Sequence, residues 1–161
     1  MIFNKDFVEY IQLLNKYEVE YVLVGGLAVN LHGYRRSTGD MDIFVNPTQE
    51  NHHKLKKVHL DFGMHMGEME ILNNFQDRSK YDVFTFGVSP IQIDVMTACK
   101  GLDFHEAYDN SIKVEIDDEI LVSVVDYREL IMAKKASNRL RDQSDIEELQ
   151  RIKKAKKNKK G

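Results

Sequence analysis

The sequence of 161 residues holds one cysteine, two prolines and no tryptophan. With Cys99 alone, no disulfide can form within the chain, and a reducing cytoplasm is the expected location. No apolar run approaches the length of a membrane span, and the residues after Met1 lack a basic-then-apolar signal pattern. These absences argue against a disulfide scaffold and a membrane protein. A content of 42% hydrophobic and 30% charged residues instead fits one soluble domain.

The net charge of −3 hides an uneven distribution of charge. Seven basic residues lie between Arg151 and Lys160, which leaves 16 basic against 26 acidic residues elsewhere, a charge near −10. We expect one domain over residues 1–150, with appended helices over 126–150, and a disordered basic tail over 151–161. The tail is either a frayed, solvated end or a segment that contacts RNA phosphates.

Apolar periodicity predicts an α/β chain of the α+β type. Its small sheet is mixed and mostly antiparallel, it is flanked by helices, and a short helical piece follows at the C-terminal end. The segment 63–79 has no clean period. The predicted helices cover residues 3–17, 27–31, 48–60, 102–108, 126–137 and 143–152, and the predicted strands cover 21–24, 40–45, 81–87, 90–96, 111–116 and 120–124.

The stretch from Tyr21 to Val45 carries the strongest functional pattern. An apolar run ends at Gly25-Gly26, a pair that suits a sharp turn, and the next residues fit a helix whose free N–H groups would hold a phosphate. A polar loop then leads to a strand with Asp40 and Asp42, which share one face because side chains alternate along a strand. Two carboxylates that face a glycine turn predict a site for a divalent cation and a polyphosphate.

The strand over residues 90–96 adds a third carboxylate. Its alternation puts Gln92 and Asp94 on one face, so Asp94 joins Asp40 and Asp42 if the two strands are neighbours. Like charges this close repel unless cations neutralise them, and carboxylate oxygens suit Mg²⁺ or Mn²⁺. Two such ions would clamp an in-line phosphoryl displacement. The pattern therefore predicts Asp40, Asp42 and Asp94 as catalytic residues and metal ligands.

Four histidines between residues 52 and 65 suggest a zinc site at first sight. Their spacing matches no tetrahedral site, and no cysteine lies near them in the sequence. We therefore expect His52, His53 and His59 on the surface of a polar helix.

Gly25-Gly26, Asp40-x-Asp42 and the later Asp94 together resemble the active-site signature of the polymerase-β-like nucleotidyltransferase superfamily. Within it, segments 24–45 and 130–149 resemble small bacterial nucleotidyltransferases related to the toxins of AbiEii-type abortive-infection and toxin–antitoxin systems. The resemblance covers most of the chain. Many members have Gly-Ser where this chain has Gly25-Gly26, and the Gly-Gly form also resembles lincosamide nucleotidyltransferases, which leaves the acceptor open.

The resemblance implies a nucleotidyltransferase fold and a template-independent reaction. A nucleoside monophosphate would pass from a nucleoside triphosphate (NTP) to a hydroxyl acceptor with release of pyrophosphate, and two Mg²⁺ or Mn²⁺ ions would be the cofactors. It also implies an NTP site, for which the candidates are Gly25, Gly26, Arg36, Thr38 and Lys134.

Two groups of charged residues have a structural alternative. Arg36 either contacts triphosphate oxygens or neutralises Asp40 or Asp42. A K-x4-R-x2-D-x2-D pattern of the AbiEii-related enzymes recurs at Lys134, Arg139, Asp142 and Asp145. In the family, such a lysine contacts the nucleotide phosphates and an acid of the last helix helps at the acceptor. The alternative is ion pairing between Arg139 and the two aspartates along one helix face.

For the acceptor, the resemblance and the basic tail favour RNA, with a tRNA end as the specific expectation. A lincosamide- or aminoglycoside-like drug and a protein hydroxyl are the other candidates. A chain that keeps the fold as a non-catalytic nucleotide-binding partner of a toxin–antitoxin pair is a further alternative. An antitoxin is the protein partner that the resemblance implies.

Overall fold

The computed structural model describes residues 3–63, 83–88 and 90–160. Much of the irregular segment 63–79 therefore lies outside the described residues. The helices are α1 (Lys5–Lys16), α2 (Gly25–Leu31), α3 (Gln49–Asp61), α5 (Phe104–Asp109), α6 (Tyr127–Ser137) and α7 (Leu140–Lys160). The strands are β1 (Tyr21–Val24), β2 (Asp40–Val45), β3 (Val83–Val88), β4 (Ile91–Met96), β5 (Ile112–Ile116) and β6 (Ile120–Val124).

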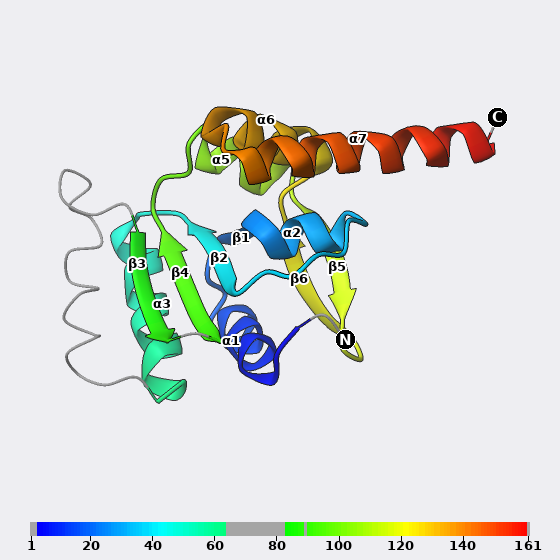
Figure 1. Ribbon diagram of the computed structural model, residues 1–161. Coiled ribbons are helices and arrows are strands. Elements are labelled where there is room, and N and C mark those ends of the chain that lie inside the picture. The colour runs from blue at the N-terminus through cyan, green and yellow to red at the C-terminus, as the bar shows by residue number, and fades with distance from the viewer. Residues whose placement is uncertain (1–2, 64–82, 89, 161) are drawn as a thin grey trace.

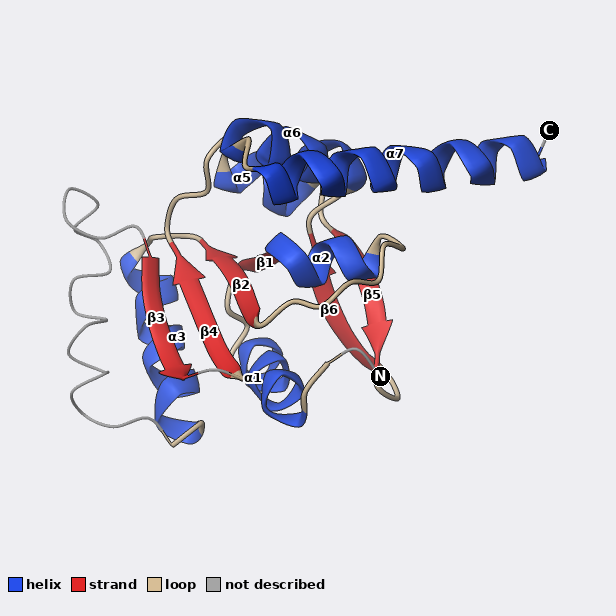
Figure 2. Ribbon diagram, in the orientation of Figure 1, coloured by secondary structure: helices blue, strands red, loops and turns tan. Residues whose placement is uncertain are grey.

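The described strands form one sheet in the order β3-β4-β2-β1-β6-β5. The pairs β3–β4, β2–β1 and β6–β5 are antiparallel, whereas β4–β2 and β1–β6 are parallel. The prediction of a mixed, mostly antiparallel sheet flanked by helices is therefore confirmed. Figure 2 shows the strands as an open sheet in which β3 and β5 are the outer strands.

The two faces of the sheet are covered by different helices. Met41 and Ile43 are buried on the face covered by α1 and α3, and the intervening residues of β2 point to the other face. There Phe44 packs edge to face on Phe104 of α5, with ring centroids 5.2 Å apart. Figure 1 shows α2, α5, α6 and α7 on this second side of the molecule. The polar residues of β2 therefore face the same space as the C-terminal helices.

Helices α1 and α3 contact each other through a buried polar pair. The Tyr10 hydroxyl lies 2.7 Å from His59 Nε2, and His59 is fully buried. Burial lowers the pKa of His59 to about 3, so the ring is neutral at ordinary pH. The expectation of surface histidines is wrong for His59 and for His52, which is also buried. The fold places this face of α3 against α1, which the polar composition of α3 did not indicate.

The junction of α6 and α7 is shorter than the sequence predicted. Asp126 caps α6 as expected, because its side chain accepts a hydrogen bond from the Glu129 N–H at 2.8 Å. Helix α6 ends at Ser137, and its C-cap residue Asn138 adopts the left-handed conformation (φ 51°) that asparagine tolerates. Helix α7 then begins at Leu140 and not at Gln143, since the Asp142 side chain accepts from the Arg139 N–H at 3.1 Å.

Helix α7 has two unlike halves. Asp142, Asp145 and Leu149 are buried and Ile152 is partly buried, a spacing that keeps one face of the helix on the body. Residues 153–159 are exposed, and the helix extends beyond the body in Figure 1. The basic segment predicted to be disordered thus continues α7, because lysine and alanine favour a helix once it has begun. Within the described ranges, no helix is long and apolar enough to cross a membrane.

Candidate active site

Three carboxylates gather on the face of the sheet that the C-terminal helices cover. Strands β2 and β4 run parallel, with Asp42 opposite Asp94 and Asp40 opposite Gln92. Asp40 and Asp42 are half-buried, whereas the intervening Met41 is fully buried on the opposite face. The two strands are therefore neighbours, which is the condition under which the sequence pattern brings Asp94 to the other two acids. The catalytic role of the three aspartates stays a prediction.

The carboxylates disfavour each other's ionisation. Burial, followed by the charges of Asp94 and Asp40 and a hydrogen bond to Asp94, raises the pKa of Asp42 to about 7, against a smaller opposing effect of Lys134. Burial and then Asp94 also raise the pKa of Asp40, while Arg141 opposes this shift. The local positive charge is thus too small to offset the acids, and a bound cation would lower these pKa values.

The donor set fits a hard divalent cation by its chemistry, since it offers carboxylate oxygens alone. In the part of the chain that the structure describes, no group of three His, Cys, Asp or Glu side chains already has the geometry of a metal-ion site. Asp42 and Asp94 form a close pair, and Asp40 lies two residues before Asp42 on the same strand face. Asp40, Asp42 and Asp94 are the residues that would hold the ion, and Asp42 and Asp94 form the closest pair among them.

Two uncharged polar side chains contact the acids. Thr85 Oγ1 of β3 donates to Asp94 Oδ1 at 2.8 Å. Gln92 Nε2 lies 3.3 Å from Asp94 Oδ1 and 3.3 Å from Asp40 Oδ2, so one amide nitrogen bridges two carboxylates. Sequence reasoning placed Gln92 on the shared face but did not single out Thr85. Its signal was weak, because one threonine in an alternating strand is usually a solvated side chain.

The glycine pair allows close packing beside the acids. Gly25 has φ +72°, and a β-carbon there would lie 2.0 Å from Asp42 Oδ2. A β-carbon on Gly26 would lie 2.3 Å from Thr38 Oγ1. Both positions therefore require glycine on steric grounds, and Gly25 also requires it for its backbone conformation. Gly25 and Gly26 are the first residues of the seven-residue helix α2, which the sequence predicted only over residues 27–31, and Gly25 lies beside Asp42.

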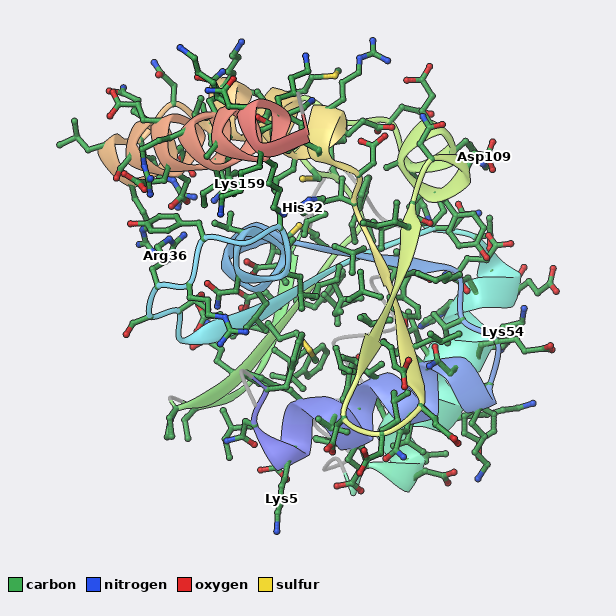
Figure 3. The ribbon with its side chains drawn as sticks, turned by 90° about the vertical axis from the view of Figure 1, so that its right-hand side faces the viewer. Lys5, His32, Arg36, Lys54, Asp109 and Lys159 are labelled. Atoms are coloured by element: carbon green, nitrogen blue, oxygen red, sulfur yellow. The ribbon has the colours of Figure 1, made fainter. Side chains whose placement is uncertain are left out.

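The predicted cations form a chain of ion pairs with the acids of α7. Lys134 Nζ lies 3.2 Å from Asp142 Oδ1 and 3.0 Å from Asp145 Oδ2. Arg36 donates to both oxygens of Asp145, at 2.6 and 2.8 Å, and Arg139 Nε donates to Asp142 at 2.7 Å. The structural alternative is thus correct for Arg139 and Asp142. Among the described residues, Arg36 pairs with Asp145 of α7 and not with Asp40 or Asp42, and Figure 3 shows it on the α7 side of the molecule.

This ion-pair chain is electrostatically favourable. Burial alone would raise the pKa of Asp142, but Arg139 and Lys134 outweigh it and lower the pKa to about 2. Burial also opposes the shift at Asp145, where Arg36 and Lys134 lower the pKa. Both acids are therefore ionised at neutral pH, and they hold Lys134 at the edge of the carboxylate cluster.

A cavity of about 190 Å³ lies between the sheet and these helices. Asp42 and Gly25 line it from one side, and Lys134 and Arg139 line it from the other. Of the three carboxylates, Asp42 lines this cavity, and it shares the cavity with cations of α6 and of the α6–α7 junction. Its remaining wall includes Cys99, a half-buried thiol whose pKa burial raises to about 11, so it is not a thiolate at neutral pH.

Replacement of Lys134 tests how much the ion-pair chain stabilises the fold. Lys134→Met should lower the free energy of unfolding by about 3–5 kcal/mol, because it leaves Asp142 and Asp145 short of a buried partner. The matched variant Lys135→Met changes an exposed lysine of the same helix and should stay within about 0.5 kcal/mol. Urea unfolding measures both. Equal stability of the two variants would show that the buried pairs contribute little.

Asp42 should make the cation-free protein less stable as pH rises. Its pKa is raised in the folded chain, so the protonated carboxyl stabilises the fold at low pH, and this contribution is lost between about pH 4 and 7. Asp42→Asn should therefore exceed the unsubstituted chain in melting temperature by a margin that grows over this range, to several degrees at pH 8 in EDTA. Thermal unfolding across pH measures the margin. A constant margin would contradict the raised pKa.

The comparison with known families agrees with this geometry. The sequence matches the family described as nucleotidyltransferase of unknown function (DUF6036) over residues 5–158, nearly the whole chain. A search of curated proteins finds no match. The match covers the glycine turn, the three aspartates and the ion-pair chain together. The chain belongs to this family of nucleotidyltransferases.

Proposed function

We propose that the protein transfers a nucleoside monophosphate from an NTP to a hydroxyl acceptor in a template-independent, divalent-cation-dependent reaction. One observation carries the proposal: Asp42 and Asp94 are register partners on neighbouring strands, and Asp40 shares their face. Burial and the neighbouring carboxylates raise the pKa values of Asp42 and Asp40, so their ionised forms need added positive charge. Bound Mg²⁺ or Mn²⁺ would supply that charge.

The proposed reaction is an in-line displacement at the α-phosphorus of the NTP. The acceptor oxygen forms a bond to the α-phosphorus, the bond from that phosphorus to the β-bridging oxygen breaks, and pyrophosphate leaves with the electron pair. Asp94 takes the hydroxyl proton, since it faces the same space as Asp42. Asp40 and Asp42 would hold both ions beside the triphosphate. Bound Mg²⁺ or Mn²⁺, two ions in the proposal, would stabilise the charge that develops on the phosphate oxygens.

The proposed triphosphate contacts come from the glycine turn and from two cations. Gly25 and Gly26 leave no side chain between the turn and Asp42, and the Thr38 hydroxyl lies beside Gly26. Lys134 lines the cavity with Asp42 and has three N–H donors, of which the two acids of α7 need two. Arg36 also retains donors beyond its pair with Asp145. Both can therefore contact a phosphate without leaving their partners.

The proposed activity is tested by labelling. The full chain is incubated with each α-labelled NTP, Mg²⁺ and separate pools of cellular RNA, cellular protein and candidate drugs, and we expect label in one pool. Asp42→Asn should abolish transfer without loss of folding, because it removes a ligand charge and relieves repulsion. Asp109→Asn, an exposed carboxylate at the end of α5, is the matched control and should retain full transfer. Normal transfer by Asp42→Asn would refute the mechanism.

RNA, with a tRNA end as the specific acceptor, is the substrate class that we propose for a toxin-type enzyme of this family. The support is the charge distribution along α7. Its last turns are basic and exposed, and Lys153 lies over the Tyr127 ring at 4.1 Å, so a cationic and aromatic surface adjoins α6. Tyr127 and Lys153 line a shallow surface depression together with Lys154 and Lys157. The acidic remainder of the chain confines RNA contacts to this surface and the site.

A matched pair of double variants tests the RNA surface. Lys154→Gln with Lys157→Gln should weaken RNA binding and reduce the slope of log affinity against log salt by up to about 0.7 for each lost phosphate contact. Lys5→Gln with Lys57→Gln removes the same charge from exposed positions of α1 and α3 and should leave the slope unchanged. NTP binding should be equal in all variants. Equal slopes in the two double variants, or label confined to a drug or a protein, would reject RNA.

Two further parts of the proposal concern the setting of the reaction. We propose a cytoplasmic location, because a chain with Cys99 as its one cysteine forms no internal disulfide and proteins of a reducing compartment rarely carry one. An antitoxin is the partner that we propose from the resemblance to AbiEii-type toxins. Copurification of an untagged antitoxin with the tagged full chain would support that partner, and failure of the two to copurify would count against it.

A further inference from the structure

Side chains from three neighbouring strands contact the carboxylate of Asp94. Its Oδ1 accepts from Thr85 Oγ1 at 2.8 Å and from Gln92 Nε2 at 3.3 Å. A carboxylate oxygen with two donors has little capacity left for a third partner. Asp42, the register partner of Asp94 on β2, is also hydrogen-bonded to it.

Gln92 also couples two of the acids. The same Nε2 that contacts Asp94 lies 3.3 Å from Asp40 Oδ2, so it joins carboxylates of β4 and β2. Gln92 is opposite Asp40 in the register, which explains how one amide reaches both. A neutral donor between two anions reduces their repulsion without supplying a competing charge.

Strand β3 contributes to this arrangement from the edge of the sheet. Thr85 is opposite Asp94 in the antiparallel pair β3–β4, which places its hydroxyl against the carboxylate. Thr85 is exposed and its neighbours Phe84 and Phe86 are buried on the other face. The position therefore requires a β-former but does not require a hydroxyl for folding.

We propose that Thr85 and Gln92 are positioning residues that hold Asp94, and through Gln92 also Asp40, in the orientation that binds the divalent cation. The inference rests on the proposed function. It adds Thr85 of β3 to a site that the pattern of Asp40, Asp42 and Asp94 had confined to β2 and β4. Hydrogen-bonded partners of metal-ligating carboxylates fix the orientation of the ligand, and their loss reduces metal affinity by about 10- to 100-fold.

The test compares two replacements of the same hydroxyl in the full chain. Thr85→Val keeps the shape and the strand preference but removes the donor, whereas Thr85→Ser keeps the donor. We expect the dissociation constant for Mn²⁺, measured by calorimetry without nucleotide, to rise at least about tenfold in Thr85→Val and to stay unchanged in Thr85→Ser. The melting temperature in EDTA should be the same in both variants. Unchanged Mn²⁺ affinity in Thr85→Val would overturn the inference.

Gln92 supplies an independent measurement, which also covers the case of a Thr85 variant that does not fold. Gln92→Leu removes the bridge between the strands and should weaken Mn²⁺ binding by about tenfold or more, with transfer restored by a higher Mn²⁺ concentration. Mn²⁺ affinity equal to that of the unsubstituted chain would overturn the role of Gln92.

The outcomes separate this inference from the proposed function. If the unsubstituted chain transfers nucleotide and binds Mn²⁺, and Asp94→Asn loses both, the proposed function stands whatever the Thr85 and Gln92 variants do. If those variants then match the unsubstituted chain, the inference alone fails. If the unsubstituted chain neither binds Mn²⁺ nor transfers nucleotide, the proposed function fails and the inference fails with it.

Discussion

The parallel pairing of β2 with β4 is the constraint on which the site depends. It sets Asp42 opposite Asp94, and two carboxylates in this position repel each other when both are ionised. Burial, followed by the charges of Asp94 and Asp40, raises the pKa of Asp42 to about 7. The fold therefore contains an unfavourable arrangement at this place. The hydrophobic face of the same strands offsets the cost, because Met41, Ile43 and Val95 are fully buried.

Both steric and electrostatic features of the surroundings accommodate the three acids. The absence of a side chain at Gly25 leaves room for Asp42, since a β-carbon at Gly25 would overlap the carboxylate. Lys134 lies close enough to Asp42 to lower its pKa slightly, but two acids of α7 hold this lysine in place. Helix α7 thus has a part in the site through Asp142 and Asp145, although its exposed basic end extends away from it. Asp42 and Lys134 line the same cavity, together with Arg139 and Asp142.

Much of this site follows from local pattern. Alternation along a strand suffices to put Asp40 and Asp42 on one face, and the capping residues Thr48 and Asp126 begin their helices as their sequence context predicts. Other features depend on contacts between distant segments. Arg36 and Asp145 are 109 residues apart in sequence, and the burial of His59 involves Tyr10 of α1 and Phe86 of β3. Local periodicity carries no information on such partners.

The sequence by itself determined the strand faces, the glycine turn and the three acids, because each depends on residues within a few positions of one another. Only the tertiary structure decided that β4 lies beside β2 in a register that pairs Asp42 with Asp94, and that Thr85 of an edge strand reaches the same carboxylate. It also decided that Lys134 is buried between two acids of α7. Register and helix docking are set by the summed packing of the whole core, which no single segment specifies.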